Sequence, residues 1–352
     1  MTPNKPELDA LDKRLLNKLQ WEFPLVPRPF LAMAESLGTT EDDVLARVAR
    51  LKADRVVRQI SAIFDTRSLG YKSSLVAMRV PAGRVDEAAA VLNEHPGVSH
   101  NYKRNHEFNL WFTLAVPPTT SLEQTVEVLH RLAEAESTRI LQTLRLFKIG
   151  VKLDMTGTED ITAQSDDGYG DHQRPAAGPA AIGPREIAFI RELQKDLPIQ
   201  PEPFAPWAQA LGMTVEALLE QAARFQEQGY MRRLAAVLHH REAGFRANAM
   251  GVWKVPPERV QELGPKFAGF NAVSHCYQRP VYPDWPYNVF TMIHGRSPAE
   301  CQKVIEAISG ATGISEYAVL YSTKEYKKTR VPYFTAAEAD WERRHLAGAT
   351  AA

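Results

Sequence analysis

An internal repeat is the feature that most constrains the fold of this chain. When the sequence is shifted by 174 positions, Leu19–Phe30 (LQWEFPLVPRPF) aligns without a gap with Leu193–Phe204 (LQKDLPIQPEPF). One inserted residue near Pro256 changes the shift to 175 and brings His100 onto His275. A repeat of this length predicts that the 352 residues form two homologous halves.

Each half begins with the pattern of three short helices. In the first half, leucines at helical spacing indicate the first helix, prolines precede the second, and a Gly-Thr turn precedes the third. Thr40 and Asp43 fit a capping box for the third helix, which is predicted to end near Lys52. Three helices with a glycine turn before the third are typical of a winged helix-turn-helix. The residues that mark them are Leu8, Leu11, Leu15, Leu16, Leu19, Pro27, Pro29, Leu37, Gly38 and Thr39, and the second-half helices are predicted to begin near Pro184, Pro203 and Val215.

The rest of each half alternates between strand and helix patterns. The order strand, helix, strand, strand, helix, strand predicts an α+β ferredoxin-like domain. In the second half the connection between the middle strands is longer, and its three prolines, at 280, 283 and 286, exclude a regular ladder. In the first half we predict strands at 73–80, 98–104, 109–116 and 139–147, and helices at 84–94 and 121–136.

These patterns divide the chain into six parts. Residues 156–183 are rich in Gly, Ala, Asp, Ser and Pro, a composition typical of a flexible linker. We therefore predict a helix-turn-helix at 1–68, a ferredoxin-like domain at 69–155, the linker at 156–183, a helix-turn-helix at 184–242, a ferredoxin-like domain at 243–334 and a tail at 335–352. The two halves are expected to pair within one chain as a pseudo-dimer, and a further homodimer stays open.

A polar pattern occurs in both halves, as Val98–His106 (VSHNYKRNH) and Val273–Arg279 (VSHCYQR). Because side chains alternate between the faces of a strand, His100, Tyr102, Arg104 and His106 share one side, as do His275, Tyr277 and Arg279. Imidazole, phenol and guanidinium groups together provide protons and positive charge. We interpret this face as a site that binds and protonates an anion; the alternative is a half-exposed strand whose polar face contacts water.

The overall composition excludes several classes of protein. Lys plus Arg equals Asp plus Glu at 42 each, so nothing indicates a general affinity for nucleic acid or for an anionic membrane. Only two cysteines occur, Cys276 and Cys301, which favours a reducing cytoplasm. The polar N-terminus does not have the pattern of a signal peptide, and no apolar run is long enough to span a membrane.

The combination of these domains resembles the Lrp/AsnC family of amino-acid-responsive regulators, as does the segment Leu8–Leu16 (LDALDKRLL). However, the third helix of the first half begins Glu41-Asp42-Asp43, where a DNA-reading helix would approach the duplex. The matching helix of the second half carries only Arg224 against two glutamates, at 216 and 220. Neither copy has the basic surface that DNA binding needs, so we expect no DNA binding.

Longer motifs resemble the siroheme decarboxylases, an enzymatic branch of that superfamily. In this branch the halves are often separate subunits; here they look fused, and the resemblance covers nearly the whole chain outside the linker and the tail. The motifs are His100–His106 (HNYKRNH), Asn109–Thr113 (NLWFT), Phe147–Asp154 (FKIGVKLD), His275–Pro280 (HCYQRP), Trp285–Gly295 (WPYNVFTMIHG) and Ser322–Lys328 (STKEYKK).

The resemblance implies that the substrate is siroheme, an iron tetrapyrrole with eight carboxylates, two of whose acetate groups become methyl groups with loss of carbon dioxide. Arginine forks suit such a polyanion, and a histidine suits delivery of a proton. No cofactor and no protein-bound metal are expected, because the iron belongs to the substrate. Expected catalytic residues are His100, His275 and His106, and expected substrate-binding residues are Tyr102, Arg104, Asn109, Tyr277, Arg279, Trp285, Asn288, Arg58, Arg67, Lys72, Arg232, Arg233, Arg241 and Lys324.

Several of these assignments leave alternatives open. His106 suits an acid, an iron ligand or a surface residue, and Trp285 suits stacking on a macrocycle or ordinary loop packing. His294, which follows an apolar strand, is more often a core or strand-end histidine than a ligand. For the whole chain, the alternative to an enzyme is a regulator or a tetrapyrrole-binding protein without turnover. The sequence does not decide which half holds the active pocket.

Overall fold

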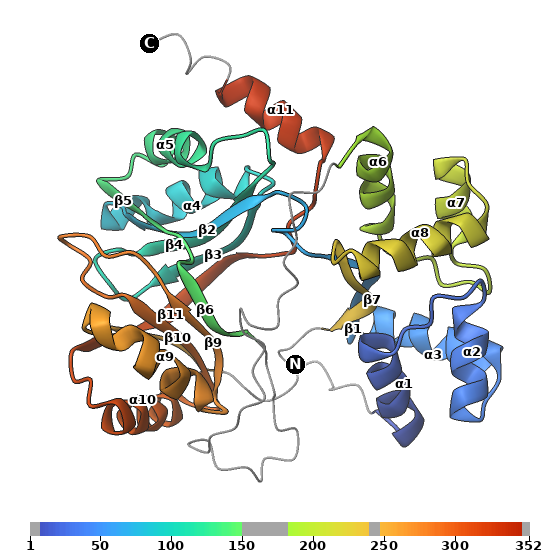
Figure 1. Cartoon of the computed structure of the whole chain (residues 1–352), viewed down its shortest axis with the longest axis horizontal. Helices are drawn as coiled ribbons and strands as arrows, with labels where there is room; N and C mark the ends of the chain where they lie inside the picture. Colours follow the sequence, from blue (N-terminus) through green and yellow to red (C-terminus); the bar gives the residue numbers. More distant parts are fainter. Residues whose placement is uncertain (1–7, 150–181, 239–246, 347–352) are drawn as a thin grey trace. The chain divides into compact units, whose positions relative to one another are not determined.

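The computed structural model describes residues 8–149, 182–238 and 247–346, which form two compact units. Within the described residues, the first unit comprises 8–71, 182–238 and 332–335, and the second comprises 72–149, 247–331 and 336–346. The units do not coincide with the two halves of the repeat. Each unit combines corresponding parts of both halves, with the short helices in one unit and the large sheet in the other (Figure 1).

The first unit confirms the two predicted helix-turn-helix segments. The predicted leucine stripe packs inward, since Leu15, Leu16 and Leu19 are buried. Gly38 and Gly212 end the second helix of each segment with φ of 72° and 62°, a left-handed conformation that glycine adopts without strain. The helices are α1 (Ala10–Trp21), α2 (Pro29–Leu37) and α3 (Glu41–Ala53), followed in the second half by α6 (Pro184–Leu193), α7 (Ala205–Leu211) and α8 (Val215–Glu227).

The predicted capping box at the start of α3 is only half formed. The Thr40 hydroxyl accepts the Asp43 N–H at 3.2 Å, but the Asp43 carboxylate does not return to the Thr40 backbone. It accepts instead from Arg47 Nε, because Arg47 lies one turn later on the same face of the helix. The reciprocal box forms at α1, between Asp9 and Asp12.

One strand from each half completes the first unit. β1 (Val57–Phe64) and β7 (Met231–Leu238) pair with each other in antiparallel fashion. The strand that follows each helix-turn-helix therefore pairs with its counterpart in the other half. Ile60 and Ala235 are buried, so the strand pair connects the two helix-turn-helix segments through core contacts as well as hydrogen bonds.

The second unit contains both predicted ferredoxin-like domains. The first half contributes β2 (Lys72–Arg79), α4 (Val85–Asn93), β3 (Val98–Arg104), β4 (Leu110–Val116), α5 (Leu122–Leu132) and β5 (Ser137–Leu141). The second half contributes β8 (Ala247–Trp253), α9 (Val260–Gly269), β9 (Val273–Gln278), β10 (Val289–Gly295), α10 (Pro298–Thr312) and β11 (Tyr317–Lys328). The strand orders β5-β2-β4-β3 and β11-β8-β10-β9 are equivalent.

Two boundaries in the first half differ from the prediction. The helix expected at 121–136 ends at Leu132, because Glu134 turns the chain with a φ of 47° and Glu136 donates its N–H to the Arg79 carbonyl. The strand expected at 139–147 is two strands, β5 and β6 (Arg145–Ile149). Arg279 explains this break. Its guanidinium donates to the carbonyl of Leu141, the last residue of β5, and to Oγ of Thr143, in the connection to β6.

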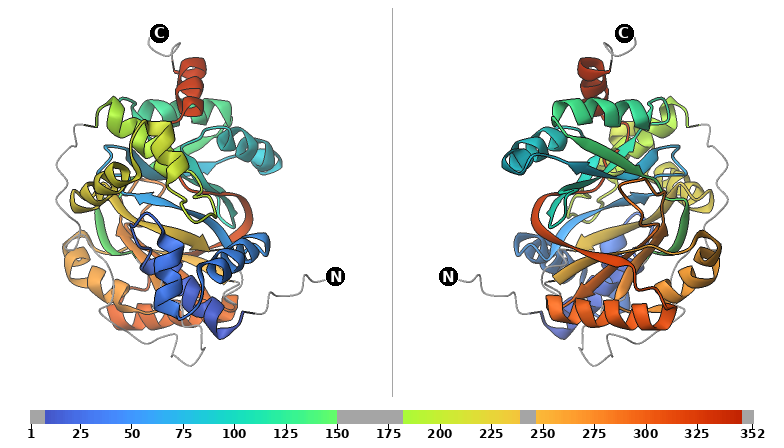
Figure 2. Two further views of the ribbon diagram at one scale, coloured as in Figure 1. Left: turned by 90° about the vertical axis from the view of Figure 1, so that its right-hand side faces the viewer. Right: turned by 90° about the vertical axis from the view of Figure 1, so that its left-hand side faces the viewer.

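The last strand segments are exchanged between the halves, so the second unit has one nine-stranded sheet. β6 of the first half pairs with β9 of the second, and the end of β11 pairs with β3 of the first. Figure 2 shows β11, in red-orange, passing from the strands of one half to those of the other. β5 and β6 are the two ends of the strand order and follow each other directly along the chain, so the sheet curls back and encloses an interior.

Three apolar clusters stabilise the second unit. One packs β2 to β4 against α4 and α5, and a second packs the strands of the other half against α9 and α10. In Figure 1 these helix pairs lie on opposite sides of the strands. The third cluster lies on the strand faces turned away from the helices; Trp111, Trp285 and Phe290 are its largest members. Among the described residues, no helix is long and apolar enough to span a lipid bilayer.

The predicted tail at 335–352 carries a helix, α11 (Ala336–His345), which packs on the first half. Its Trp341 is buried, and the Trp341 ring lies 4.2 Å from the ring of His95. His95 Nδ1 accepts the Gly97 N–H at 2.9 Å. Burial, followed by repulsion from Lys327 and His345, lowers the pKa of His95 to about 3, so this imidazole is neutral in the folded protein.

We expect His95 to make the fold sensitive to acid. In the unfolded chain His95 takes up a proton near its ordinary pKa of 6.5, whereas in the folded protein it does so only near 3. The unfolded state therefore binds more protons in this window, and the free energy of unfolding falls as the pH drops from 6.5 towards 3 by about 1.4 kcal/mol per pH unit. His95→Phe should lose this part of the slope in urea titrations between pH 7 and 4.

The matched control is His130→Gln, which removes a half-buried histidine that bonds Thr138. It tests whether the replacement of any histidine changes the slope. Other groups whose pKa the fold lowers, among them His275 (to about 4), His106 and Asp12, account for the part of the slope that remains in His95→Phe. An unchanged slope in His95→Phe would show that the proton uptake occurs elsewhere.

Candidate functional site

The two repeated motifs form matching rows on strands β3 and β9. The ring centroids of His100 and Tyr102 are 6.2 Å apart, and Arg104 Cζ lies 5.7 Å from the Tyr102 ring. In the second row His275 stacks on Tyr277 at 6.0 Å, and Arg279 Cζ lies 4.6 Å from the Tyr277 ring. Each row therefore occupies one face of its strand, as alternation predicts.

Both rows face the interior of the sheet rather than the helices. The residue between His100 and Tyr102, Asn101, points the other way and donates to the Ala89 carbonyl on α4. Arg104 and Arg279 instead lie beside the aromatic rings of the central cluster. Arg104 Cζ is 6.0 Å from the Trp111 ring, and Arg279 Cζ is 5.4 Å from the Phe290 ring.

Both arginines are buried and have no acidic partner among the described residues. Arg104 Nη1 donates to Leu320 O on β11 at 3.0 Å, and Arg279 Nη1 donates to Leu141 O on β5. The Nε atom of each arginine is buried without a hydrogen-bond partner. Burial lowers the pKa of each guanidinium to about 10, so both are still cations at neutral pH. A buried cation without a counter-ion favours the binding of an anion.

His100 and His275 lie close enough for their charges to repel each other. Burial is the main reason why the pKa of His275 falls to about 4; repulsion from His294, His100 and Arg279 lowers it further. His275 is therefore neutral at physiological pH. Each histidine also contacts the preceding serine: Ser99 Oγ lies 3.1 Å from His100 Nδ1, and Ser274 Oγ lies 2.8 Å from His275 Nδ1.

His106 lies beyond the end of β3, next to an aromatic cluster. Its ring is 5.3 Å from that of Trp285, and its Nδ1 accepts the Phe108 N–H at 3.1 Å. Burial lowers the pKa of His106. Trp285 is fully buried in the proline-rich loop, and its Nε1 has no hydrogen-bond partner. The Trp285 ring also contacts Phe108, Trp111, Tyr287 and Phe290.

Asn109 and Asn288 have equivalent structural contacts. The Asn109 side chain accepts the Val80 N–H and donates to the Val80 carbonyl, at 3.1 and 2.7 Å. Asn288 makes the same two bonds with Val255, at 2.9 and 2.8 Å. Each amide thus fixes the start of a strand, and its predicted role towards substrate stays a prediction. The sequence motifs identified both residues but did not indicate this function.

The other predicted cations are scattered. In the second unit, Lys72 is exposed at the start of β2, and Lys324 Nζ lies 3.0 Å from Asp86 Oδ1. The first unit holds four: Arg58 and Arg67 are exposed on or after β1, Arg232 pairs with Asp65 at 2.6 Å, and Arg233 lies 4.4 Å above the Trp21 ring. Arg241 and the neighbouring His239 and His240 lie outside the described residues, as does most of the predicted linker.

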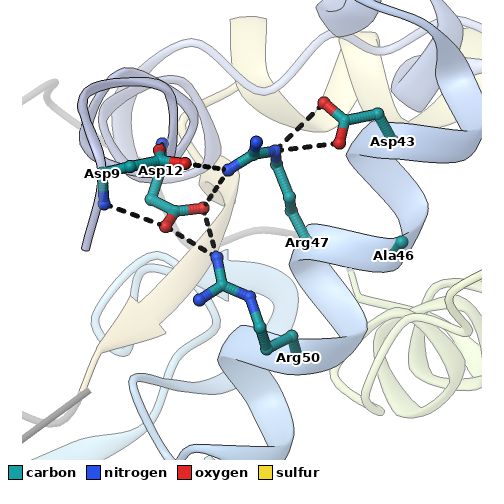
Figure 3. A pocket seen from close by; sticks show the side chains of 6 residues that line it. All are labelled: Asp9, Asp12, Asp43, Ala46, Arg47 and Arg50. Carbon is teal, nitrogen blue, oxygen red and sulfur yellow. Dashed lines mark hydrogen bonds and ion pairs between the residues drawn. The ribbon is translucent and has the colours of Figure 1, made fainter. Parts of the chain in front are cut away.

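A network of ion pairs covers the start of the first helix-turn-helix (Figure 3). Arg47 of α3 contacts Asp9, Asp12 and Asp43 at 2.7, 2.8 and 3.0 Å, and Arg50 contacts Asp12 at 2.6 Å. Burial opposes ionisation of Asp12, but the hydrogen bonds from Arg50 and Arg47 lower its pKa. The sequence shows the acidic start of α3. It does not show that Asp9 and Asp12, at the start of α1, neutralise Arg47 and Arg50.

We expect no specific or general affinity for DNA from this segment. Arg47 and Arg50 would have to leave three carboxylates before contacting phosphate, and Arg28 is paired with Glu41. The measurement is fluorescence anisotropy with a labelled random duplex at physiological salt. Submicromolar binding that weakens steeply as salt rises would contradict this prediction, because that dependence reports phosphate contacts.

The comparisons with known proteins cover most of the chain. The family described as AsnC-like ligand binding domain matches residues 68–148 and 242–327, and the siroheme decarboxylase NirDL-like HTH domain matches 12–58 and 186–232. The siroheme decarboxylase of Hydrogenobacter thermophilus is 40% identical over 93% of this chain and 96% of its own. A siroheme decarboxylase beta subunit of Methanosarcina barkeri is 43% identical over 42% of this chain and 96% of its own.

A solved structure agrees with these matches. The crystal structure of the siroheme decarboxylase NirDL in co-complex with an iron-uroporphyrin III analogue has a TM-score of 0.76 and 34% identity, and the match covers 97% of this chain and all of the other. The match to a separate beta subunit indicates that this chain joins in one polypeptide two parts that elsewhere occur as subunits. This chain belongs to the siroheme decarboxylase family.

Proposed function

We propose that this protein is a carboxy-lyase that removes carbon dioxide from two acetate side chains of siroheme, giving didecarboxysiroheme for modified-haem or alternative haem biosynthesis. The observation that carries the proposal is a pair of buried arginines, Arg104 and Arg279, each in a row with a histidine and without an acidic partner in the described part of the chain. Relatives with this activity in their names, aligned over nearly the full chain, support the same substrate.

The geometry supports different roles for the arginines, tyrosines and histidines of the two rows. Arg104 and Arg279 hold substrate carboxylates by charge-assisted hydrogen bonds, and Tyr102 and Tyr277 orient the guanidinium groups. When the bond between the methylene carbon and the carboxylate breaks, carbon dioxide leaves. The electron pair of the broken bond passes into the conjugated ring. A histidine of the rows then gives a proton to the remaining methylene carbon, which becomes a methyl group. No electron is gained or lost overall, so we propose that the reaction needs no added cofactor.

The decisive experiment is anaerobic incubation of the purified protein with siroheme, with no other addition, followed by mass spectrometry. The expected products have lost one and then two molecules of carbon dioxide. If siroheme binds but keeps its mass, the second candidate applies, a tetrapyrrole-binding protein without turnover. A transcriptional regulator is not favoured, because the arginines of α3 are held by the acidic residues of α1. We place the enzyme in the cytoplasm, acting as an intramolecular pseudo-dimer.

A further inference from the structure

A continuous chain of hydrogen bonds leads from the interior histidine of the second row to the outside of the sheet. Ser274 Oγ lies 2.8 Å from His275 Nδ1 and 2.7 Å from His294 Nε2. His294 Nδ1 lies 2.7 Å from Oδ1 of Asn248, an exposed residue on β8. Serine, histidine and asparagine thus form three successive links behind His275.

With the Asn248 amide oxygen towards His294 and both imidazoles neutral, the chain has one consistent orientation. Asn248 Oδ1 only accepts, so His294 Nδ1 carries the hydrogen and His294 Nε2 carries the lone pair. The Ser274 hydroxyl then donates to His294 Nε2 at 2.7 Å rather than to the Met292 carbonyl at 3.3 Å, and its oxygen accepts from His275 Nδ1. His275 therefore carries its hydrogen on Nδ1 and a lone pair on Nε2. Burial, and after it repulsion from His294, His100 and Arg279, disfavours a second hydrogen on this ring and lowers its pKa.

The first half has no counterpart of His294 at the equivalent position. Asn109 and Asn288 are equivalent, because each bonds the backbone just after the first strand of its ferredoxin-like domain. Asn109 bonds Val80 after β2, and Asn288 bonds Val255 after β8. Six residues after Asn288 comes His294, and six residues after Asn109 comes Ala115. On the neighbouring strand Asn248 pairs with His294, whereas Ser73 pairs with Ala115. Behind the contact of Ser99 with His100, Ala115 therefore stands where the second half has His294.

We propose that Asn248, His294 and Ser274 are positioning residues that hold His275 with its lone pair on Nε2, so that the second row offers an electron pair to siroheme while His100 supplies the proton. This inference rests on the proposed function for its substrate, but the tautomer of His275 is a property of the protein alone. His100 and His275 occupy equivalent positions in the repeat, but the inference makes His100 a proton donor and His275 an electron-pair donor. Metal-binding and hydrogen-bond-accepting histidines are commonly fixed in this way by a partner on their other nitrogen.

The tautomer can be measured without substrate by nitrogen-15 NMR of the full chain labelled at histidine, with the His275 signals identified from a His275→Gln variant. The expected wild-type result at neutral pH is a hydrogen on His275 Nδ1. His294→Leu and Ser274→Ala should lose this preference, whereas His294→Gln, which keeps an acceptor for Ser274, should retain it. His130→Gln, which removes a histidine bonded to Thr138 in the first half, is the control and should change nothing at His275.

Turnover gives the second measurement. His294→Leu should lower kcat for siroheme about 10-fold or more, the usual scale for a lost partner behind a functional histidine, and His294→Gln should restore most of it. A wild-type hydrogen on Nε2, or the same tautomer and rate in His294→Leu and Ser274→Ala, would overturn the inference. If the wild-type protein does not decarboxylate siroheme, the proposed function fails, whereas the NMR result decides the tautomer separately.

Discussion

A His100→Ala variant is expected to decarboxylate siroheme about 100-fold more slowly than the wild type, or slower still. The physical reason is the loss of a general acid, whose contribution is typically 100-fold to 10,000-fold. KM should change much less than kcat, because Arg104, which is predicted to hold the carboxylate, keeps its bond to Leu320 O. The measurement is single-turnover mass spectrometry under anaerobic conditions, with retained circular dichroism as evidence of folding.

The product distribution adds a second result. If one pocket acts twice, His100→Ala slows both losses of carbon dioxide together; if each half has its own pocket, a mono-decarboxylated product accumulates. His130→Gln, which removes a histidine of the same half outside the rows, should keep wild-type kinetics. Wild-type rates in His100→Ala would remove β3 from the catalytic site. The duplicated motif would then have to serve binding alone.

Trp285→Ala is expected to have the largest effect on stability. The Trp285 ring belongs to the second half, is fully buried, and contacts His106, Phe108 and Trp111 of the first half. Removing a buried tryptophan leaves a cavity and costs about 3–5 kcal/mol of unfolding free energy. The measurement is urea unfolding followed by circular dichroism.

Val281→Ala is the matched control for this substitution. Val281 lies in the same loop but is 55% exposed, so its truncation should change the unfolding free energy by less than about 0.5 kcal/mol. After proteolytic cleavage within 156–183, the wild-type halves should stay together on a sizing column, and those of Trp285→Ala should separate more readily. Equal stability of the two variants would show that this cluster does not hold the halves together.

Much of the fold follows from local patterns in the sequence. The leucine stripe of α1, the glycine turns at Gly38 and Gly212 and the alternating strands all depend on near neighbours, and the structure confirms them. The exchange of β6 and β11 between the halves could not be predicted. It depends on contacts such as that of Arg104 with Leu320 of β11, which are distant in sequence and have no local pattern.

The candidate site shows the same limit. Strand alternation correctly placed His100 and Tyr102 on one face, but no sequence pattern indicated that Arg104 is buried and bound to a backbone carbonyl of the other half. The apolar strand before His294 predicts a core or strand-end histidine, and His294 does lie near the end of β10. Its contact with Ser274 needs the register of β9 against β10, which only the folded sheet defines.

The exchange of β11 has a consequence for synthesis of the chain. The hydroxyl of Thr323 on β11 bonds the Lys103 carbonyl on β3, and 220 residues separate the two. At roughly 5–20 residues per second, a ribosome needs about 10–45 s to make that distance, and during this time β3 has no partner on one side. An unpaired strand edge is a template for aggregation, so nascent chains that stall in the second half should be the main clients of chaperones. In this fused chain, the N-terminal half cannot finish folding until the ribosome has nearly completed the polypeptide.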